Sequence, residues 1–239
     1  MALPPRPCGS VWLHAARAPC VALDTLAPGP VLVLAPHPDD ETLGCGEALA
    51  AARAAGREVT VALITRGDDA QPRSRTHPRP AMAALRRREF ARALVALGGA
   101  GAVHLDLPDA RPARAKDANR LAASLETVAR GAGAAVIWSA WERDPHVDHA
   151  LTAAAARLVA GRLDLPLWFY AVWGRFGAVR APTGLRRFAD ARARPRKRRA
   201  AAAHRSQLTP LVRDDPAGFT MPVPFRQHFV TTPELFVPA

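Results

Sequence analysis

Cysteine is scarce in this sequence, with three residues among 239. Cys8, Cys20 and Cys45 are too few and too scattered for a disulfide framework or for a zinc site built from thiolates. Such cysteine usage is typical of a reducing compartment, and we predict a cytoplasmic protein.

Long apolar runs are also absent from the sequence. No stretch approaches the roughly 20 uncharged apolar residues that a membrane-spanning helix needs, so we predict no membrane span. Residues 1–23 carry Pro and Arg where a secretion signal needs an unbroken apolar core. Because 49% of the residues are hydrophobic, the chain can bury a full-sized core, and one α/β domain is expected in preference to two small ones.

Acidic residues are outnumbered by basic ones, 21 against 33, which gives a formal net charge of +12. Such an excess raises the possibility of a nucleic-acid or anionic-membrane partner. However, the densest basic run, residues 192–199, has no interleaved aromatic side chains for base stacking. Ala, Arg, Pro and Gly are used heavily throughout, as in proteins of GC-rich genomes. We therefore predict a solvated loop and helix start there, and no nucleic-acid partner.

From residue 31 onward, short apolar runs alternate with helical patterns, which is typical of βαβ units and a parallel sheet. The predicted fold class is α/β, with a Rossmann-like open, mostly parallel sheet flanked by helices. Residues 1–29 are expected to be an N-terminal extension packed on the outside, and residues 30–239 a single domain. The predicted strands are 31–35, 59–65, 102–105, 134–138 and 165–173, and predicted helices cover 42–56 and 150–159, end at Gly98, and run from an N-cap at Asp117 to Gly131.

The first predicted strand ends in a group of charged side chains, within the sequence VLVLAPHPDDETLGCG of residues 31–46. A second polar cluster, Asp144-Pro-His-Val-Asp-His149, follows the fourth predicted strand. Ligands of open parallel sheets bind beyond the carboxyl ends of the strands. If the two strands are neighbours, the two clusters face each other across one crevice.

Together the two clusters offer imidazole and carboxylate groups but no thiolate. Catalytic zinc commonly takes three such protein ligands and leaves a position for water, although iron(II) or another divalent ion also suits these donors. Asp39 and Asp40 are adjacent, so their side chains leave the backbone in different directions. One of them can bind a metal while the other remains free as a base.

At these motifs the sequence resembles the PIG-L/LmbE-like zinc deacetylases, which hydrolyse the N-acetyl group of N-acetylglucosamine-containing substrates. The resemblance rests on the stretch from His37 to Glu41 and on the His-x-Asp-His motif of residues 146–149. Weaker matching pieces bring the similarity to about residues 30–210, namely Thr65-Arg66-Gly67, Arg86, Glu89, Leu107-Pro108-Asp109, Lys197 and residues 204–207.

The resemblance implies a role for each motif residue. His37, Asp40 and His149 would be the ligands of Zn²⁺, and a metal-bound water, its pKa lowered to about 7, would be the nucleophile. Asp39 would be the general base. His146 would stabilise the oxyanion and serve as acid, with Asp148 holding its ring. Whether His146 or protonated Asp39 supplies the proton to the leaving amine is left open by the sequence.

Two further residues follow predicted strands and are expected to point into the crevice. Arg66 and Asp109 are predicted to bind sugar hydroxyls or an attached anionic group, and residues 67–80 form a Pro-rich loop that suits a binding loop or lid. The expected partner is a small amino-sugar or glycoconjugate substrate, and a homo-oligomer is left open. The alternatives are a metal amidase for a thiol conjugate or another acylated amine, a two-metal phosphoesterase, and a non-catalytic anion-binding protein.

Overall fold

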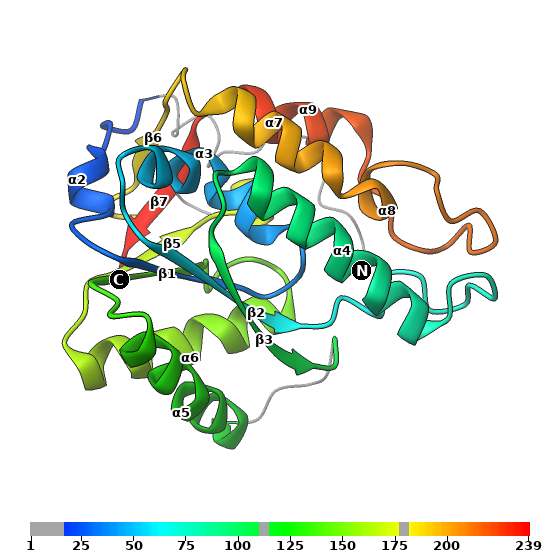
Figure 1. Ribbon diagram of the computed structural model, residues 1–239, viewed down its shortest axis with the longest axis horizontal. Helices are drawn as coiled ribbons and strands as arrows, with labels where there is room; N and C mark the ends of the chain where they lie inside the picture. Colours follow the sequence, from blue (N-terminus) through cyan, green and yellow to red (C-terminus); the bar gives the residue numbers. More distant parts are fainter. Residues whose placement is uncertain (1–16, 110–114, 177–181) are drawn as a thin grey trace.

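The computed structural model describes residues 17–109, 115–176 and 182–239. Helices and strands alternate through most of this range (Figure 1). In chain order the elements are α2 (Leu23–Leu26), β1 (Val31–Ala35), α3 (Asp40–Ala54), β2 (Val59–Thr65), α4 (Arg79–Ala96), β3 (Gly101–Leu107), α5 (Ala115–Gly131), β4 (Val136–Ala140), α6 (Val147–Leu163), β5 (Leu167–Tyr170), the 3₁₀ turn η1 (Gly174–Phe176), β6 (Arg186–Phe188), α7 (Arg194–Ala203), α8 (Arg205–Leu208), α9 (Val223–Thr231) and β7 (Glu234–Pro238).

The strands form one seven-stranded sheet in the order β3-β2-β1-β4-β5-β7-β6. The first five are parallel, and β7 runs antiparallel to both of its neighbours. The predicted fold class is therefore confirmed. The order along the chain reverses between β1 and β4, which pair directly from Val31↔Val136 to Leu34↔Ser139. This reversal is the switch point at which such sheets bind ligands.

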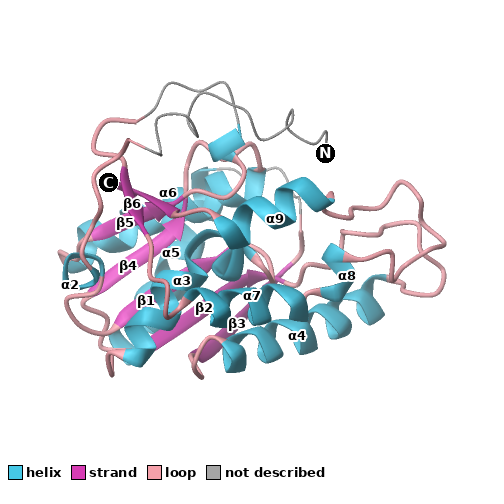
Figure 2. Cartoon of the chain, turned by 90° about the horizontal axis from the view of Figure 1, so that it is seen from above, coloured by secondary structure: helices cyan, strands magenta, loops and turns pink. Residues whose placement is uncertain are grey.

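Helices cover both faces of the sheet, with α5 and α6 on one side and α3, α4, α7 and α9 on the other (Figures 1 and 2). The strand β1 shows why, because all five of its residues are buried. Val31 and Val33 belong to the core cluster under α3 and α4, whereas Leu32 and Leu34 belong to the cluster under α5 and α6. Successive side chains of a strand point to opposite faces, so a continuous apolar run predicts a strand covered on both sides.

The structure corrects several predicted boundaries. The helix expected to be capped by Asp117 already begins at Ala115, so Asp117 lies inside its first turn. The helix α6 is longer than predicted, and β5 is shorter than the apolar run of residues 165–173 because that run continues into the turn before η1. Within the basic run, Lys197 is fully buried, contrary to the expected solvated segment.

The predicted extension of residues 1–29 is described only from residue 17. Its later part packs into the domain, since Leu26 and Ala27 are fully buried in the same core cluster as α3. The indole N–H of Trp138 in β4 donates a hydrogen bond to the carbonyl oxygen of Leu26 at 2.8 Å. Residues 17–29 therefore help to close the core beside the sheet.

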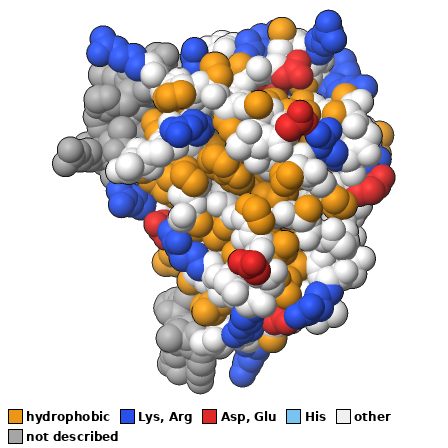
Figure 3. All heavy atoms as spheres, turned by 90° about the vertical axis from the view of Figure 1, so that its left-hand side faces the viewer, with side chains coloured by type: hydrophobic (Ala, Val, Ile, Leu, Met, Phe, Trp, Pro, Cys, Tyr) orange, Lys and Arg blue, Asp and Glu red, His pale blue; other side chains and the backbone are white. Residues whose placement is uncertain are grey.

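None of the described helices combines the length and the apolar character that crossing a bilayer requires. Figure 3 shows the face at the left of Figure 1, where apolar side chains gather in the centre and Lys and Arg side chains are spread around them. On this face the excess positive charge does not form one continuous basic patch.

Candidate metal centre and active site

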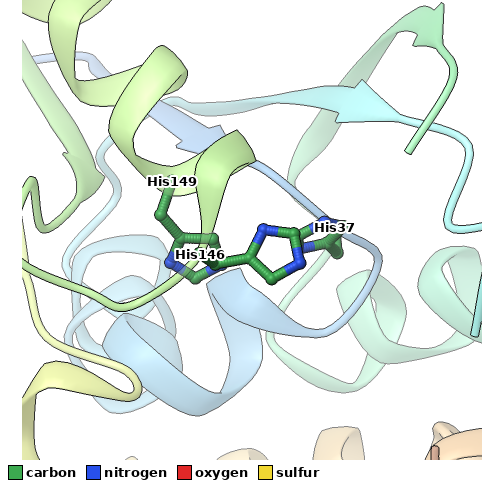
Figure 4. A group of neighbouring side chains, drawn as sticks. All are labelled: His37, His146 and His149. Atoms are coloured by element: carbon green, nitrogen blue, oxygen red, sulfur yellow. The ribbon is translucent and has the colours of Figure 1, made fainter. Parts of the chain in front are cut away.

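The two polar clusters meet at the switch point between β1 and β4, as the sequence predicts. His37 follows β1, and His146 and His149 lie at the start of α6, which follows β4. Figure 4 shows the three rings side by side where the loop after β1 approaches the first turn of α6. One nitrogen of each ring lies within 4.8 Å of the others, so these histidines form a group that could hold a metal ion.

Asp40 provides a carboxylate oxygen between two of these rings. Its Oδ2 atom lies 3.0 Å from Nδ1 of His37 and 3.1 Å from Nε2 of His149. His149 is fully buried, yet its Nε2 atom makes no hydrogen bond of acceptable geometry with the described residues. A buried ring nitrogen in that state, facing a carboxylate and a second imidazole, fits a divalent metal ion. These donors suit a metal ion, but the histidine group contains His146 where the sequence predicts Asp40, and the choice of Asp40 as the third ligand stays a prediction.

The other ring nitrogen of His149 is held by Asp144, whose Oδ2 atom lies 2.9 Å from Nδ1. The same carboxylate accepts hydrogen bonds from the backbone N–H groups of Val172 and Gly174, so its own position is fixed. A carboxylate on the far nitrogen of a ligating histidine selects the tautomer and orients the ring. The sequence analysis did not assign this role to Asp144, although the residue lies within the second motif.

His146 is the third histidine of this group. Its Nδ1 atom accepts a hydrogen bond from the backbone N–H of Asp148 at 3.2 Å and thereby caps α6. Because Nδ1 is an acceptor there, the proton of the neutral ring lies on Nε2. Burial, followed by the nearby rings of His37 and His149, lowers the pKa of His146 to about 4. This imidazole is therefore neutral near pH 7.

Asp148 lies between two histidines but nearer to one of them. Its Oδ2 atom is 3.0 Å from Nε2 of His37 and 3.8 Å from Nδ1 of His146. In this arrangement its closest ring is that of a predicted metal ligand. An orienting action of Asp148 on His146 stays a prediction.

The imidazoles of His37 and His149, the two predicted metal ligands, favour their protonated forms in the metal-free arrangement. Burial opposes protonation of His37, but the hydrogen bonds to Asp148 and Asp40 outweigh it and raise its pKa to about 9. For His149, burial is likewise outweighed by the charge of Asp40 and the bond to Asp144, and its pKa rises to about 10. The site thus behaves as a cluster of negative charge that attracts cations, either protons or a metal.

Asp39 is the predicted base, and it is held in a strained conformation. Its φ of 150° lies in the region that favours glycine, and its side chain is almost completely buried. Burial raises the pKa of Asp39 to about 6, against the opposing charge of Arg86. Non-glycine residues in such conformations persist where the surroundings over-determine them, often at functional sites. The strained Asp39 therefore fits a functional position.

Arg86 of α4 holds the Asp39 carboxylate and the backbone of the same turn. Its Nη2 atom lies 3.3 Å from a carboxylate oxygen of Asp39 and donates to the carbonyl oxygen of Pro38 at 3.0 Å. Its Nη1 atom donates to the carbonyl oxygen of Gly67, and the whole side chain is buried. The sequence analysis placed Arg86 among the matching pieces but gave it no role. The distance of Arg86 from the motifs along the sequence does not predict this role, because only the fold brings α4 next to this turn.

The cluster opens into a cavity of about 420 Å³. Its polar lining includes His37, Asp39, Asp40, His146 and Arg86, and Leu43, Trp173 and Phe219 contribute apolar side chains. Asp69, Ala70, Pro72 and residues 217–220 also line the cavity, and a hydrogen bond from the N–H of Phe219 to the carbonyl oxygen of Ala70 joins the two segments. The predicted binding loop after β2 thus lines the cavity together with a segment near the end of the chain.

The two predicted substrate-binding residues differ in their placement. Asp109 lines the cavity, but its carboxylate accepts hydrogen bonds from the N–H groups of Gly67 and Asp69 and so shapes the loop after β2. The side chain of Arg66 is 42% exposed, pairs with Asp68, and is not one of the residues that line this cavity. Substrate contact by either residue stays a prediction.

A family comparison decides the assignment. The model of the PIG-L family, described as GlcNAc-PI de-N-acetylase, matches residues 32–160, more than half of the chain. The chain belongs to the PIG-L family. The matched segment contains both motifs. A comparison with curated protein sequences found no match.

Solved structures of similar fold include several deacetylases. The A40926 pseudoaglycone deacetylase Dbv21 is 29% identical, with a TM-score of 0.60 over 73% of this chain and 81% of its own. A triple mutant of a deacetylase of teicoplanin biosynthesis is 22% identical, with a TM-score of 0.66 over 87% of this chain and 97% of its own. N,N'-diacetylchitobiose deacetylase from Pyrococcus horikoshii is 18% identical, with a TM-score of 0.71 over 91% and 87%. These last two establish the PIG-L fold of the chain.

Proposed function

We propose that this member of the PIG-L family is a metal-dependent N-deacetylase that removes an N-acetyl group from an amino sugar or its glycoconjugate. The observation that carries the proposal is the convergence of His37, Asp40 and His149 beside a buried, ionisable Asp39, with His37, Asp39 and Asp40 lining the cavity. The family match and the deacetylase named for A40926 pseudoaglycone, at 29% identity, support the reaction and the substrate class.

His37, Asp40 and His149 would hold the metal, for which Zn²⁺ fits the donor set and Fe²⁺ is the alternative. A divalent ion in such a site supplies Lewis acidity, which polarises the amide carbonyl and lowers the pKa of water to about 7.

Asp39 acts as the general base. Its carboxylate takes a proton from the attacking water as the new C–O bond forms at the acetyl carbonyl carbon. With a pKa of about 6, Asp39 is mostly ionised at pH 7 but close enough to that pH to carry the proton for a short time. It then delivers this proton to the leaving nitrogen as the C–N bond breaks, which gives the free amine and acetate.

His146 stabilises the developing oxyanion. The geometry at α6 places the proton of its neutral ring on Nε2, since Nδ1 accepts the backbone N–H of Asp148. A neutral imidazole with a pKa of about 4 donates a hydrogen bond to an oxyanion without needing to be charged first. We therefore propose that Asp39, and not His146, delivers the final proton to the leaving amine. The carboxylate of Asp148 lies beside the rings of His37 and His146 and helps to orient them.

The test combines metal analysis with turnover of the wild type and of Asp39→Asn. We expect about one zinc or iron per chain in both proteins, with release of amine from N-acetyl amino sugars falling at least 100-fold in the variant. The exposed Asp106, which pairs with Arg87, provides the control Asp106→Asn, which should keep full activity. Near-normal turnover by Asp39→Asn would remove this residue from the mechanism.

The same experiment separates the alternatives. Hydrolysis of thiol-conjugate amides in preference to amino sugars would establish an amidase of a different substrate class, with the same machinery. Two metal ions per chain would favour a phosphoesterase. Absence of metal after reconstitution would overturn the proposal as a whole.

We also propose a cytoplasmic location, which the free thiols of Cys20 and Cys45 support.

A further inference from the structure

The helix that carries Asp40 is broken one turn after the metal site. Cys45 has φ −140° and ψ 19°, so α3 consists of a short first segment, Asp40 to Gly44, and a longer second one. The first segment carries the proposed ligand Asp40, and its Leu43 lines the cavity. The direction of this segment therefore decides where the Asp40 carboxylate points.

A buried ion pair from two distant elements lies at this break. Lys197 of α7 and Glu234 of β7 are both fully buried, and Nζ lies 2.7 Å from Oε1. Taking two charges out of water is expensive, and replacing such a pair with apolar residues is often neutral or stabilising. Overall stability is thus a poor reason for the pair, and its hydrogen bonds to α3 suggest a better one.

Each member of the pair bonds to one side of the break. Both carboxylate oxygens of Glu234 accept N–H groups of the second segment, from Glu47 at 2.6 Å and from Ala48 at 2.8 Å. The ammonium group of Lys197 donates to the carbonyl oxygen of Leu43 in the first segment at 2.9 Å.

In a continuous helix, the N–H of Glu47 would donate to the carbonyl of Leu43. Here a carboxylate takes that donor and an ammonium group takes that acceptor. Glu234 thereby serves the second segment as an N-terminal cap, with the favourable charge for that end of a helix.

The first segment is also held from the sheet side. A Cβ atom on Gly44 would lie 2.2 Å from the ring of Tyr170, so this backbone packs directly on the ring. The hydroxyl of Tyr170 donates to the carbonyl oxygen of Leu34 in β1 at 2.7 Å. The segment is therefore fixed between Tyr170 and Lys197.

We infer that the Lys197–Glu234 pair is a positioning element for the metal centre: it holds α3 broken at Cys45 and so aims Asp40 at His37 and His149. The inference rests on the proposed function, because it assigns to Asp40 the role of a metal ligand. Neither Lys197 nor Glu234 is among the residues that line the cavity.

The test is the double variant Lys197→Met/Glu234→Gln, which removes both charges and keeps similar side-chain volumes. We expect its affinity for Zn²⁺, measured by competition with a chromophoric chelator, to fall at least tenfold. The visible spectrum of the Co²⁺ form should change, and kcat should fall with KM within about twofold of the wild type. A merely structural role would lower the melting temperature and leave the spectrum of the folded Co²⁺ form unchanged.

Arg194→Ala is the matched control. Arg194 lies on the same helix as Lys197 and pairs with Glu47 of α3 at 3.1 Å, but it does not bond to Leu43 or to Glu234. We expect this variant to keep the metal affinity and the Co²⁺ spectrum of the wild type. If the double variant does not fold, the same measurements are made on Glu234→Gln. Its amide oxygen still accepts one of the two N–H groups, so this variant should fold.

A folded variant with unchanged affinity and spectrum would overturn the inference and leave the proposed function intact. A wild-type protein that binds no metal and releases no amine would overturn the proposed function, and this inference with it.

Discussion

Arg86 and Asp39, which both line the cavity, form a buried contact of 3.3 Å between α4 and the turn that follows β1. Burial raises the pKa of Asp39 to about 6, and the charge of Arg86 limits that rise. The contact with Arg86 thus lowers the pH at which the proposed base is ionised, against the larger effect of burial. We therefore predict that the pH profile of the proposed reaction depends on Arg86, which is not part of either motif.

Replacing Arg86 should shift the pH dependence of catalysis. In Arg86→Met the pKa of Asp39 should rise further, because an opposite charge at this distance lowers a carboxyl pKa by about 1–3 units. Asp39 would then be protonated near pH 7, and the acidic limb of kcat/KM should move to higher pH by about one unit or more. Arg87→Met, at the exposed neighbouring position, is the control. An acidic limb that stays in place would show that Arg86 does not tune the base.

Metal binding should release protons and become tighter as the pH rises. The raised pKa values of His37, about 9, and His149, about 10, mean that both rings are protonated in the metal-free protein at pH 7. Both must lose a proton to become ligands. Calorimetric titration with Zn²⁺ in buffers of different ionisation enthalpy should therefore report about two protons released per ion. Titrations without proton release would contradict this ionisation state.

The same shifts give the sign of the stability change in the metal-free protein. Folded-state pKa values above the ordinary 6.5 stabilise the folded protein below that pH. This contribution is lost as the pH rises through about 9 and 10. Urea unfolding in the presence of a chelator should thus show lower stability at pH 9.5 than at pH 7. Saturating metal should reduce the difference, since the two rings are then neutral ligands at both pH values.

Loss of Asp144 should weaken the metal site without removing a ligand. Asp144→Asn would lose the charged partner of His149 while keeping a side chain of the same shape. Such outer partners of metal ligands are typically worth 10–100-fold in affinity, and competition with a chelator should show a loss of this size. Glu142→Gln, at the surface pair with Arg157, should leave the affinity unchanged. Equal affinities for the Asp144 variant and the wild type would contradict the orienting role.

Two glycine substitutions in helices should have opposite effects. In Gly44→Ala the new methyl group would overlap the ring of Tyr170, and we expect destabilisation of about 1–3 kcal/mol or more. Gly161→Ala, in α6, meets nothing within 4 Å and should stabilise the protein by roughly 0.5–1 kcal/mol. Urea unfolding of both variants measures these changes. A neutral Gly44→Ala would show that the close packing on Tyr170 is not required.

Much of the fold could be predicted from the sequence, because the signals are local. The run Val31–Ala35 is apolar at every position, which indicates a strand buried on both faces, and the structure confirms its bounds. The antiparallel β7 could not be predicted in the same way. Its residues 234–238 contain Glu234, whose charge argues against a buried strand until the partners of that side chain are known. The pairing with Lys197 is a tertiary contact that no local pattern records.

In the site, too, some residues could be predicted from local sequence motifs and others depend on tertiary contacts. His37, Asp40 and His149 could be predicted to converge, since motifs after neighbouring parallel strands meet at one edge of the sheet. Arg86 and Asp144 were not assigned, because their roles depend on which backbone groups they reach. Asp109 illustrates the converse: its position after β3 suggested a substrate contact, while its carboxylate accepts two backbone N–H groups of the loop after β2.

The contact between Ala48 and Glu234 joins residues that are 186 positions apart in the sequence. At a synthesis rate of about 5–20 residues per second, roughly 10 to 40 seconds separate the appearance of these two residues during translation. The N–H groups at the start of the second segment of α3 are therefore capped only after β7 has been synthesised. The nascent chain consequently carries an uncapped break in α3 until β7 has been made, and chaperones would meet it in that form.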